Sequence, residues 1–483
     1  MMLRSIRVAA FLSAAVWGAL SSAEDGKNPV EVGAAAATLS DSFSAALHAS
    51  LHRILSEAGM PNPLRAERQR PIDPRLLKIE SVGWEASGLF PGKVHQARNA
   101  KEVQALSGRL EPGDQLALTG TAWKDVRFTF AGHGTAQAPI LVRPERPGSV
   151  VFGGDSRVAF HGEHLVVMGL EFRDGVVSEK NTVIFRLGYG AEKPANHCIV
   201  NRIRMENCNS ASPSEWPEVR MWLLNVQGKG NTIANSVFAE LKNFGQMLAA
   251  GELPADGLLG LHILNNRFLD RPKIDNQNGY EIIQIGGSGE MARPSGVLIQ
   301  GNTFENCNGE NEILTLKTSD VFVRCNTFSG CKGVLSLRMG DRMLVQRNLF
   351  DGNGRSNTGG VGVEGAGHVI IENTFRHLRA PRNYHFWPLL MACASSEKTG
   401  DDRQGYGRVK NVLIAENYFD HNDARIAVGT YPRPEYPLLP KDIWVRNNVF
   451  IGTTANSPFD YMAPDPTGAM QKTIHESGNQ FRP

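Results

Sequence analysis

A short motif, Asn followed by one residue and then Phe, recurs through the second half of the chain and constrains the fold more than any other feature. From Asn302 to Asn373 successive motif asparagines are 24, 22 and 25 residues apart. That period is too short for a helical-hairpin array or a propeller blade, and it fits one coil of a solenoid built from small strands. The motif stands at Asn266-Arg267-Phe268, Asn302-Thr303-Phe304, Asn326-Thr327-Phe328, Asn348-Leu349-Phe350, Asn373-Thr374-Phe375, Asn417-Tyr418-Phe419 and Asn448-Val449-Phe450.

Aliphatic runs ahead of each motif predict the strands of this solenoid. Val321 with Val323, and Val412 with Ile414, are typical of these runs, which end at Asn or Gly. Stacked asparagines can exchange side-chain amide hydrogen bonds, and stacked phenylalanines can form a buried aromatic ladder. We therefore predict an all-β fold, a single-stranded right-handed parallel β-helix.

The N-terminus has the layout of a secretory signal peptide, which we place at residues 1–23. Arg4 and Arg7 precede an apolar stretch from Val8 to Leu20, and small residues follow up to Ala23. The stretch is too short for a membrane anchor, so a secreted or periplasmic location is expected. The net charge of +2 neither requires nor excludes a polyanionic partner. No nucleic-acid partner is expected, and the sequence does not determine the oligomeric state.

Two helices are expected near the N-terminal end of the β-helix domain, which we place at residues 98–483. Residues 24–97 would hold an amphipathic helix over 39–58 and a proline-rich linker over 60–75. A shorter helix is predicted to begin at Asn99. It would cover the open end of the β-helix, where unpaired strand edges otherwise invite aggregation.

Two of the six cysteines occupy equivalent positions in neighbouring repeats. Cys307 and Cys331 each follow the motif Phe by three residues, which predicts a separation of about 5 Å between adjacent coils. This spacing allows a disulfide, and it equally allows two stacked free thiols in the core. No Cys and His spacing in the chain is typical of a zinc site.

Strand parity predicts which side chains leave the core in the segment from Glu312 to Lys317. Leu314 and Leu316 are expected to point inward and Ile313 outward, because successive side chains of a strand alternate between its faces. Glu312 and Lys317 then differ in parity. Both can serve one groove only if the chain bends between them, and the sequence does not show such a bend.

Aligning the inward aliphatic residues of successive coils brings charged residues together on the outer face. Lys317, Arg338 and Glu364 fall in one outward column on three coils. On the preceding coil Glu281 aligns with Glu312. Charged residues on a solenoid are usually only solvated, but this constellation on adjacent coils favours a functional site.

Oxygen-bearing side chains gather at the other end of the same strands. In the alignment Asn278 falls beside Glu310, and Glu312 follows two residues later. Carboxylate and amide oxygens are the ligands that a hard cation prefers, and Ca²⁺ is the expected ion outside the cell. The sequence therefore predicts a calcium site formed by Asn278, Glu310 and Glu312.

At these residues the chain resembles the chondroitinase-B-like family of polysaccharide lyases, which includes alginate lyases and a dermatan sulfate lyase. The resemblance covers residues 98–455. It rests on the spacing of the active-site pattern, and on segments that resemble the first coils of the family. The pattern comprises Glu310, Glu312, Lys317 and Arg338, and the segments are Gly113-Asp114-Gln115-Leu116, Gly134-Thr135, Ala138-Pro139-Ile140, Pro147-Gly148 and Gly169-Leu170-Glu171-Phe172.

The resemblance implies cleavage of a uronate polymer by β-elimination, most plainly alginate, with dermatan or chondroitin sulfate as the alternative. It implies Ca²⁺ held by Asn278, Glu310 and Glu312, a base at Lys317 and an acid at Arg338. The chemistry agrees, because the C5 proton of a uronate is weakly acidic and a cation on the carboxylate stabilises the charge formed when it leaves. Lysine is a base only when neutral, and arginine stays charged beside the leaving oxygen.

Two positions depart from the family pattern, and both bear on the subsites that bind sugar. Met339 stands where the family often has histidine, and Gly362 stands where it tends to carry arginine. Further side chains are candidates for sugar binding, although any one of them taken alone is more readily structural. They are Tyr280, Glu281, Glu364, His385, Trp387, Arg425 and Tyr431.

Two other functions fit the same fold. A β-helix that only binds glycan would use groove aromatics and would not need the column of Lys317 and Arg338. A hydrolase would need a pair of carboxylates as acid and base, taken from Glu281, Glu312 and Glu364. Only elimination creates an unsaturated uronate, so its ultraviolet absorbance separates these functions. The polymer and the choice of endo or exo action are not determined by the sequence.

Overall fold

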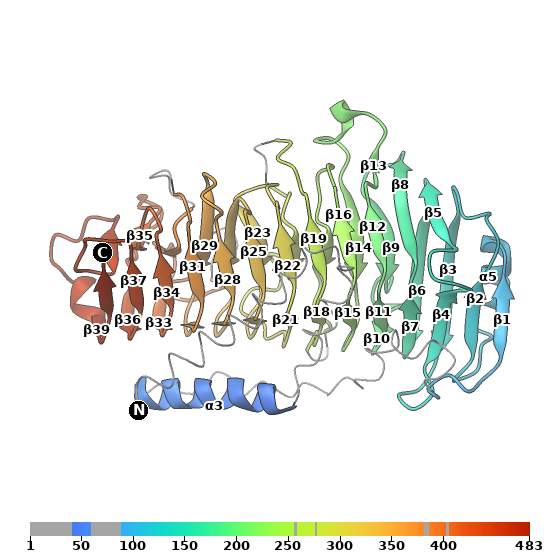
Figure 1. Ribbon diagram of the computed structural model, residues 1–483, viewed down its shortest axis with the longest axis horizontal. Helices are drawn as coiled ribbons and strands as arrows, with labels where there is room; N and C mark the ends of the chain where they lie inside the picture. The colour runs from blue at the N-terminus through green and yellow to red at the C-terminus, as the bar shows by residue number, and fades with distance from the viewer. Residues whose placement is uncertain (1–40, 59–87, 256–257, 276–277, 381–385, 402–404) are drawn as a thin grey trace. The chain divides into compact units, whose positions relative to one another are not determined.

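The computed structural model describes residues 41–58, 88–255, 258–275, 278–380, 386–401 and 405–483. From residue 88 onward the strands stack coil upon coil into three sheets, and pairings between successive coils are parallel (Figure 1). The predicted parallel β-helix is therefore confirmed. Its first strand begins at Val94, ahead of the predicted boundary at residue 98.

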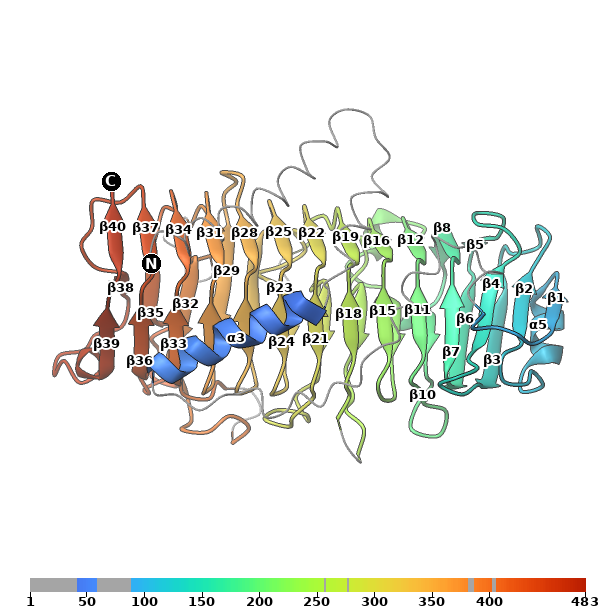
Figure 2. The ribbon, with the colours of Figure 1, turned by 60° about the horizontal axis from the view of Figure 1, so that its bottom comes forward.

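Sheet 1 runs the length of the β-helix and is seen face-on in Figure 2. Its strands are short because each coil turns a corner after a few residues. In spatial order they are β1 (Val94–Ala97), β2 (Gln115–Leu118), β4 (Ile140–Pro144), β7 (Leu165–Met168), β11 (Ile199–Asn201), β15 (Thr232–Ala234), β18 (His262–Leu264), β21 (Leu298–Gln300), β24 (Phe322–Arg324), β27 (Leu344–Gln346), β30 (Val369–Ile371), β33 (Lys410–Ala415), β36 (Lys441–Arg446) and β39 (Ile474–Ser477).

Sheet 2 carries the charged column predicted from the sequence. The strand β3 (Arg127–His133) pairs with its second member, β6. The remaining strands, in spatial order, are β10 (Ala195–Asn196), β6 (Arg157–Glu163), β9 (Thr182–Leu187), β14 (Met221–Val226), β17 (Leu248–Ala250), β20 (Ile283–Ile285), β23 (Glu312–Leu316), β26 (Gly333–Leu337), β29 (Thr358–Val363), β32 (Leu389–Ala392), β35 (Ile426–Thr430) and β38 (Phe459–Tyr461).

Sheet 3 contains the motif phenylalanines. The strand β5 (Val151–Gly154) pairs with β8. The others, in spatial order, are β13 (Asn209–Ser210), β8 (Glu171–Val177), β12 (Arg204–Glu206), β16 (Val237–Ala239), β19 (Arg267–Leu269), β22 (Thr303–Glu305), β25 (Thr327–Ser329), β28 (Leu349–Asp351), β31 (Thr374–Arg376), β34 (Tyr418–Asp420), β37 (Val449–Ile451) and β40 (Gln480–Arg482).

The motif asparagines form a continuous ladder at the corner between sheets 1 and 3. The side-chain oxygen of Asn348 accepts from the backbone N–H and the amide of Asn326, at 3.0 Å each. The Asn348 amide in turn donates to Asn373 and to the carbonyl of Val323. A residue with positive φ precedes each corner, as at Cys325 (φ 54°). The ladder satisfies buried backbone groups that the corner leaves without sheet partners.

The motif phenylalanines stack inside the β-helix as predicted. Neighbouring rings from Phe268 to Phe450 lie nearly parallel, with centroids 4.7 Å apart for Phe328 and Phe350, and Phe238 and Phe481 extend the stack at its two ends. Cys307 and Cys331 are buried free thiols whose sulfurs donate to the carbonyl oxygens of Phe268 and Phe304. Of the two arrangements that the sequence allowed, the structure contains the stacked thiols.

Helices form at both places where they were expected. α3 (Asp41–Ala58) belongs to a separate compact unit of the chain that ends at Glu57. α5 (Ala100–Leu106) is capped by Asn99, whose side chain accepts from the backbone N–H of Glu102, and it covers the first coil beside β1 and β3 (Figure 1). Within the described coils, single turns of 3-10 helix occur at η4 (Pro213–Glu215) and η5 (Gln471–Thr473).

Three predictions lie outside the described residues: the signal peptide at 1–23, the linker at 60–75 and the sugar-binding role of His385. Among the helices that the structure describes, none is both long and apolar enough to cross a membrane.

Candidate active site

A pocket of about 350 Å³ opens on the outer face of sheet 2, over β23, β26, β29 and β32. Acidic groups, two cations and two tyrosines surround it, so the pocket suits a charged, polar ligand. Its lining residues are Asp275, Asn278, Glu310, Asn311, Glu312, Lys332, Val334, Ser336, Arg338, Gly362, Glu364, Leu390, Tyr406 and Tyr431.

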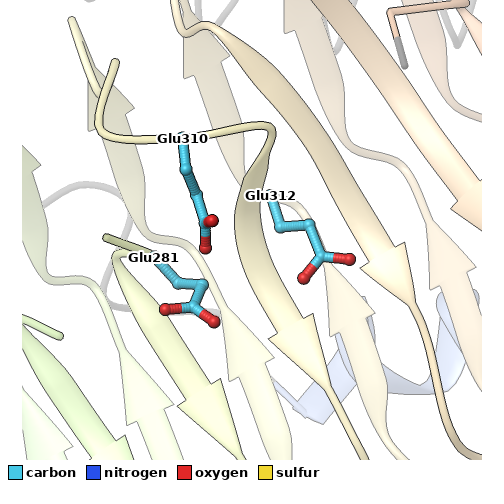
Figure 3. Close-up of side chains that lie close together, drawn as sticks. All are labelled: Glu281, Glu310 and Glu312. Carbon is cyan, nitrogen blue, oxygen red and sulfur yellow. The ribbon is translucent and has the colours of Figure 1, made fainter. Parts of the chain in front are cut away.

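Three carboxylates converge at the edge of this pocket. Oxygens of Glu281, Glu310 and Glu312 lie within 4.8 Å of one another, and Figure 3 shows the three side chains directed toward a common space. Burial, together with the negative charges of Glu281 and Glu312, raises the pKa of Glu310 to about 9. Its buried Oε1 has no hydrogen-bond partner among the described residues.

This cluster fits a hard divalent cation. Crowded carboxylates with an unsatisfied buried oxygen are costly unless protonated or bound to a cation, and oxygen ligands are those that Ca²⁺ takes. Asn278 lines the same pocket, as expected for the predicted ligand set. The structure also brings in Glu281, which we had assigned to substrate binding. Its alignment with Glu312 was the sequence signal for this position.

A chain of hydrogen bonds along sheet 2 holds Glu281 in place. The indole Nε1 of Trp222 donates to Gln246 Oε1 at 2.6 Å, and Gln246 Nε2 donates to Glu281 Oε2 at 2.7 Å. Glu281 is only 2% exposed. Because one oxygen is fixed by the amide, the carboxylate is oriented before any ion binds.

A β-bulge resolves the parity conflict between Glu312 and Lys317. The register of β23 against β26 shifts between Glu312 and Leu314, and Ile313 and Leu314 both lie in the core. The prediction that Ile313 faces outward was therefore wrong. The extra inward residue lets Glu312 and Thr315 share the outer face, where Thr315 Oγ1 donates to Glu312 Oε2 at 2.8 Å.

A glycine allows β26 to approach the turn that carries Glu310. Gly333 has a φ of 108°, and a Cβ at this position would lie 2.6 Å from the carbonyl oxygen of Asn311. Another residue would meet both the strained backbone angle and this contact.

Arg338 is held against Glu312. Its Nη1 donates to both carboxylate oxygens of Glu312 at 3.1 Å each, and Ser336 Oγ donates to Oε1 at 3.0 Å. The negative charge of Glu312 raises the pKa of Arg338 above its ordinary value, so the guanidinium stays charged. The Tyr406 ring, 5.8 Å from the guanidinium carbon, covers its other side.

Lys317 follows β23 directly, and Arg338 follows the neighbouring strand β26. Two residues before them Thr315 pairs with Ser336, and the backbone N–H of Met339 donates to the carbonyl of Leu316, so the ends of the two strands stay adjacent. Paired strands are about 4.8 Å apart, so Lys317 and Arg338 leave the same end of two neighbouring strands. Lys317 is half-buried and is not among the described residues that line the pocket.

Glu364, the third residue of the outward column with Lys317 and Arg338, lines the pocket. It is 4% exposed, and its Oε2 has no hydrogen-bond partner within the described part of the chain. Burial raises its pKa to about 8, the charge of Glu312 adds to this shift, and Arg338 opposes it. At neutral pH Glu364 is therefore largely a neutral acid.

Three other predicted sugar-binding side chains are not among the described residues that line the pocket. Tyr280 is fully buried beside Phe244, and the guanidinium of Arg271 lies over its ring. Arg425 forms an ion pair with Asp460, and Trp387 is 6% exposed in an apolar cluster. Tyr431 does line the pocket.

The two residues that depart from the family pattern lie in different environments. Met339 is buried, whereas Gly362 lines the pocket. A Cβ at Gly362 would lie 3.3 Å from Val334, and Leu390 is the next neighbour. This part of the pocket therefore has an apolar floor.

Sequence reasoning missed several residues that shape the site. Lys332 precedes β26, and its outward position could have been found by extending the parity of that strand. Gln246 could have been found by aligning its strand with Glu281. Tyr406 lies between named strands, where no periodic pattern gives a signal.

Comparison with known proteins agrees with the geometry. The family profile of chondroitinase B matches residues 97–451. No curated protein matches the sequence. A mannuronic acid specific polysaccharide family 6 lyase from human gut microbiota is 26% identical, over 79% of this chain and 84% of that one, with a TM-score of 0.70.

The family 6 alginate lyase AlyGC is 25% identical over 79% of this chain, with a TM-score of 0.70, and the match spans 53% of its own length. The family 6 lyase Pedsa3628 from Pseudopedobacter saltans, at 21% identity over 80% of this chain and 92% of that one, shares the fold with a TM-score of 0.65. The fold and site define a β-helical enzyme that acts on polysaccharides. The chain belongs to the chondroitinase B family and is a polysaccharide lyase.

Proposed function

We propose that the protein cleaves alginate, with poly-mannuronate as the preferred polymer, by calcium-assisted β-elimination. The observation that carries this proposal is the cluster of Glu281, Glu310 and Glu312 beside the charged Arg338, with Lys317 on the adjoining strand. The specificity is supported by the likeness to a lyase described as specific for mannuronic acid.

The acidic end of the pocket would hold the ion. Glu281, Glu310 and Glu312 supply carboxylate oxygens, and Asn278 supplies an amide oxygen. When bound, Ca²⁺ supplies positive charge to the uronate carboxylate and so stabilises the charge that develops as C5 loses its proton. Glu312 also accepts from Arg338, so the same carboxylate sets the distance between the ion site and the guanidinium.

Lys317 would take the C5 proton in its neutral form. The C5–H bond breaks, its electron pair forms the C4–C5 double bond, and the bond from C4 to the glycosidic oxygen breaks. Lysine acts in this way only as the neutral amine, whereas Arg338, which follows the next strand, stays charged. The proton then leaves Lys317 to solvent.

Arg338 would stabilise the leaving oxygen. Its guanidinium is charged at every relevant pH, and Glu312 and Tyr406 fix its orientation on two sides. A preorganised cation of this kind lowers the free energy of the transition state without rearranging during the reaction. The departing oxygen receives its proton from water or from the guanidinium.

The proposal is tested by incubating the calcium-loaded protein with poly-mannuronate, poly-guluronate, dermatan sulfate and pectate in separate reactions. Ultraviolet absorbance of the unsaturated uronate is recorded with time. Poly-mannuronate should give the fastest rise. A faster rise with dermatan sulfate would replace the proposed substrate, and no rise with any polymer would contradict the elimination itself.

A further inference from the structure

Lys332 differs in its surroundings from the other cation that lines the pocket. Arg338 is paired with Glu312, whereas the Lys332 ammonium forms no ion pair with any carboxylate that the structure describes. The Lys332 Nζ lies 5.9 Å from the centroid of the Phe386 ring. The Lys332 backbone N–H donates to Asn308 Oδ1 at 3.0 Å. The pocket thus contains one cation without an internal partner among the described residues.

This cation is partly withdrawn from water. Burial, with the positive charge of Lys273 added, lowers the pKa of Lys332 below its ordinary value, and Glu310 opposes the shift. Burying a charge without a partner costs free energy, and a ligand that brings an anion recovers that cost. Lysine is also a common partner of carboxylates and phosphates.

Lys332 is placed to contact the sugar next to the one that reacts at the acidic cluster. Lys332 precedes β26, whereas Glu310 precedes β23, so the two lie one coil apart on the same side of the pocket. Adjacent coils are about 4.8 Å apart. Beyond Lys332 the floor of the pocket is apolar at Val334, Gly362 and Leu390, with no second unpaired cation among the described lining residues.

We infer that Lys332 binds the carboxylate of the uronate next to the residue that loses its C5 proton, and so selects polymers with two consecutive uronates. This inference rests on the proposed function for the identity of the polymer. It assigns Lys332 to substrate binding and gives it no part in proton transfer.

The test compares wild-type protein with Lys332→Met, which keeps the length of the side chain and removes its charge. Lys273→Met is the matched control, because Lys273 is an exposed neighbouring lysine outside the pocket lining. Calorimetry measures the Kd of a mannuronate oligosaccharide and, separately, the Kd of Ca²⁺. The same oligosaccharide with its carboxylates reduced to hydroxymethyl groups serves as the neutral probe.

Lys332→Met should raise the Kd of the charged oligosaccharide about tenfold, as expected for one lost charge-assisted hydrogen bond. Lys273→Met should leave it unchanged, Lys332→Arg should restore most of the affinity, and the neutral probe should not distinguish wild type from Lys332→Met. An unchanged Kd for the charged oligosaccharide, with Ca²⁺ bound more tightly, would overturn the inference and assign Lys332 to balancing the acidic cluster.

The two proposals fail in different ways. If the wild-type protein binds the oligosaccharide but forms no unsaturated product, the proposed elimination fails and the comparison at Lys332 still decides this inference. If the wild-type protein neither binds nor cleaves it, both are overturned.

Discussion

Sheets 2 and 3 belong to the same coils, yet they differ in regularity. The sheet 3 strands β22, β25, β28 and β31 pair without any shift of register, and their phenylalanines form one stack. In sheet 2 the register shifts between β23 and β26 and again between β26 and β29. From this difference we infer that the regular pairing of sheet 3 sets the spacing between successive coils. Sheet 2 can then bulge and present Glu312 and Thr315 on one face.

This comparison leads us to expect two kinds of variant. Substitutions on the outer face of sheet 2 should lower catalytic activity while the protein remains folded. Changes in the asparagine and phenylalanine ladders should lower stability, while the molecules that remain folded stay active.

The largest effect is expected for Lys317→Ala, which removes the proposed base. The kcat should fall about 10³-fold, within the range typical of a lost general base, while the Kd of an oligosaccharide changes little. Lys317→Arg should be equally inactive because arginine cannot become neutral near pH 7. Steady-state rates and calorimetry measure the two quantities. Activity above about a tenth of wild type would exclude Lys317 as the base.

Glu312→Gln should lower kcat/KM about 100-fold, since it weakens both the ion site and the hold on Arg338. Adding Ca²⁺ should recover only part of the loss. Removing Ca²⁺ from the wild-type protein with a chelator should stop turnover, and Ca²⁺ should restore it. A chelated protein that still turns over at the normal rate would show that these acids have another role.

The ladder side is tested by Asn348→Ala. The change leaves the backbone N–H of Asn326 and the carbonyl of Val323 without their side-chain partners, at a cost of about 3 kcal/mol in the free energy of unfolding. Urea unfolding measures the loss, and kcat measured well below the new Tm should stay near the wild-type value. A kcat that falls with stability would mean that the two sides are not independent.

A smaller effect is expected for Gln246→Leu, which removes the amide that orients Glu281. The Kd of Ca²⁺ should rise about tenfold, and Trp222→Phe, one hydrogen bond further away, should raise it less. Calorimetric titration with Ca²⁺ measures both. Equal effects of the two variants would argue against an ordered chain of hydrogen bonds.

The last prediction concerns pH and the metal-free protein. The pKa of Glu310 is raised to about 9 and that of Glu364 to about 8, so the folded state keeps protons that the unfolded state releases near pH 4.5. The contribution of these two groups to the free energy of unfolding is therefore fully present below pH 4.5 and is lost as the pH rises toward 9. The Tm should therefore fall across this window without Ca²⁺, and Ca²⁺ should reduce the fall. A flat profile would contradict burial of protonated acids.

The sequence predicted the regular side of the molecule well, because the period of the Asn and Phe motif directly reports coil length. It also predicted that Glu310, Glu312 and Arg338 lie together, since inward aliphatic residues align successive coils. It could not predict the bulge at Ile313, because an isoleucine side chain is acceptable on either the inner or the outer face of a strand. Tyr406 was missed because its position depends on how the long connection between β32 and β33 folds over sheet 2. No local sequence pattern predicts the path of such a connection.

Elimination on the outer face of sheet 2 is tested most directly by counting the products formed from poly-mannuronate. Each bond broken by elimination creates one new reducing end and one unsaturated uronate. We predict equal numbers of both throughout the reaction with calcium-loaded protein. New reducing ends without ultraviolet absorbance would instead establish hydrolysis by a carboxylate pair such as Glu312 and the protonated Glu364, and would contradict the account.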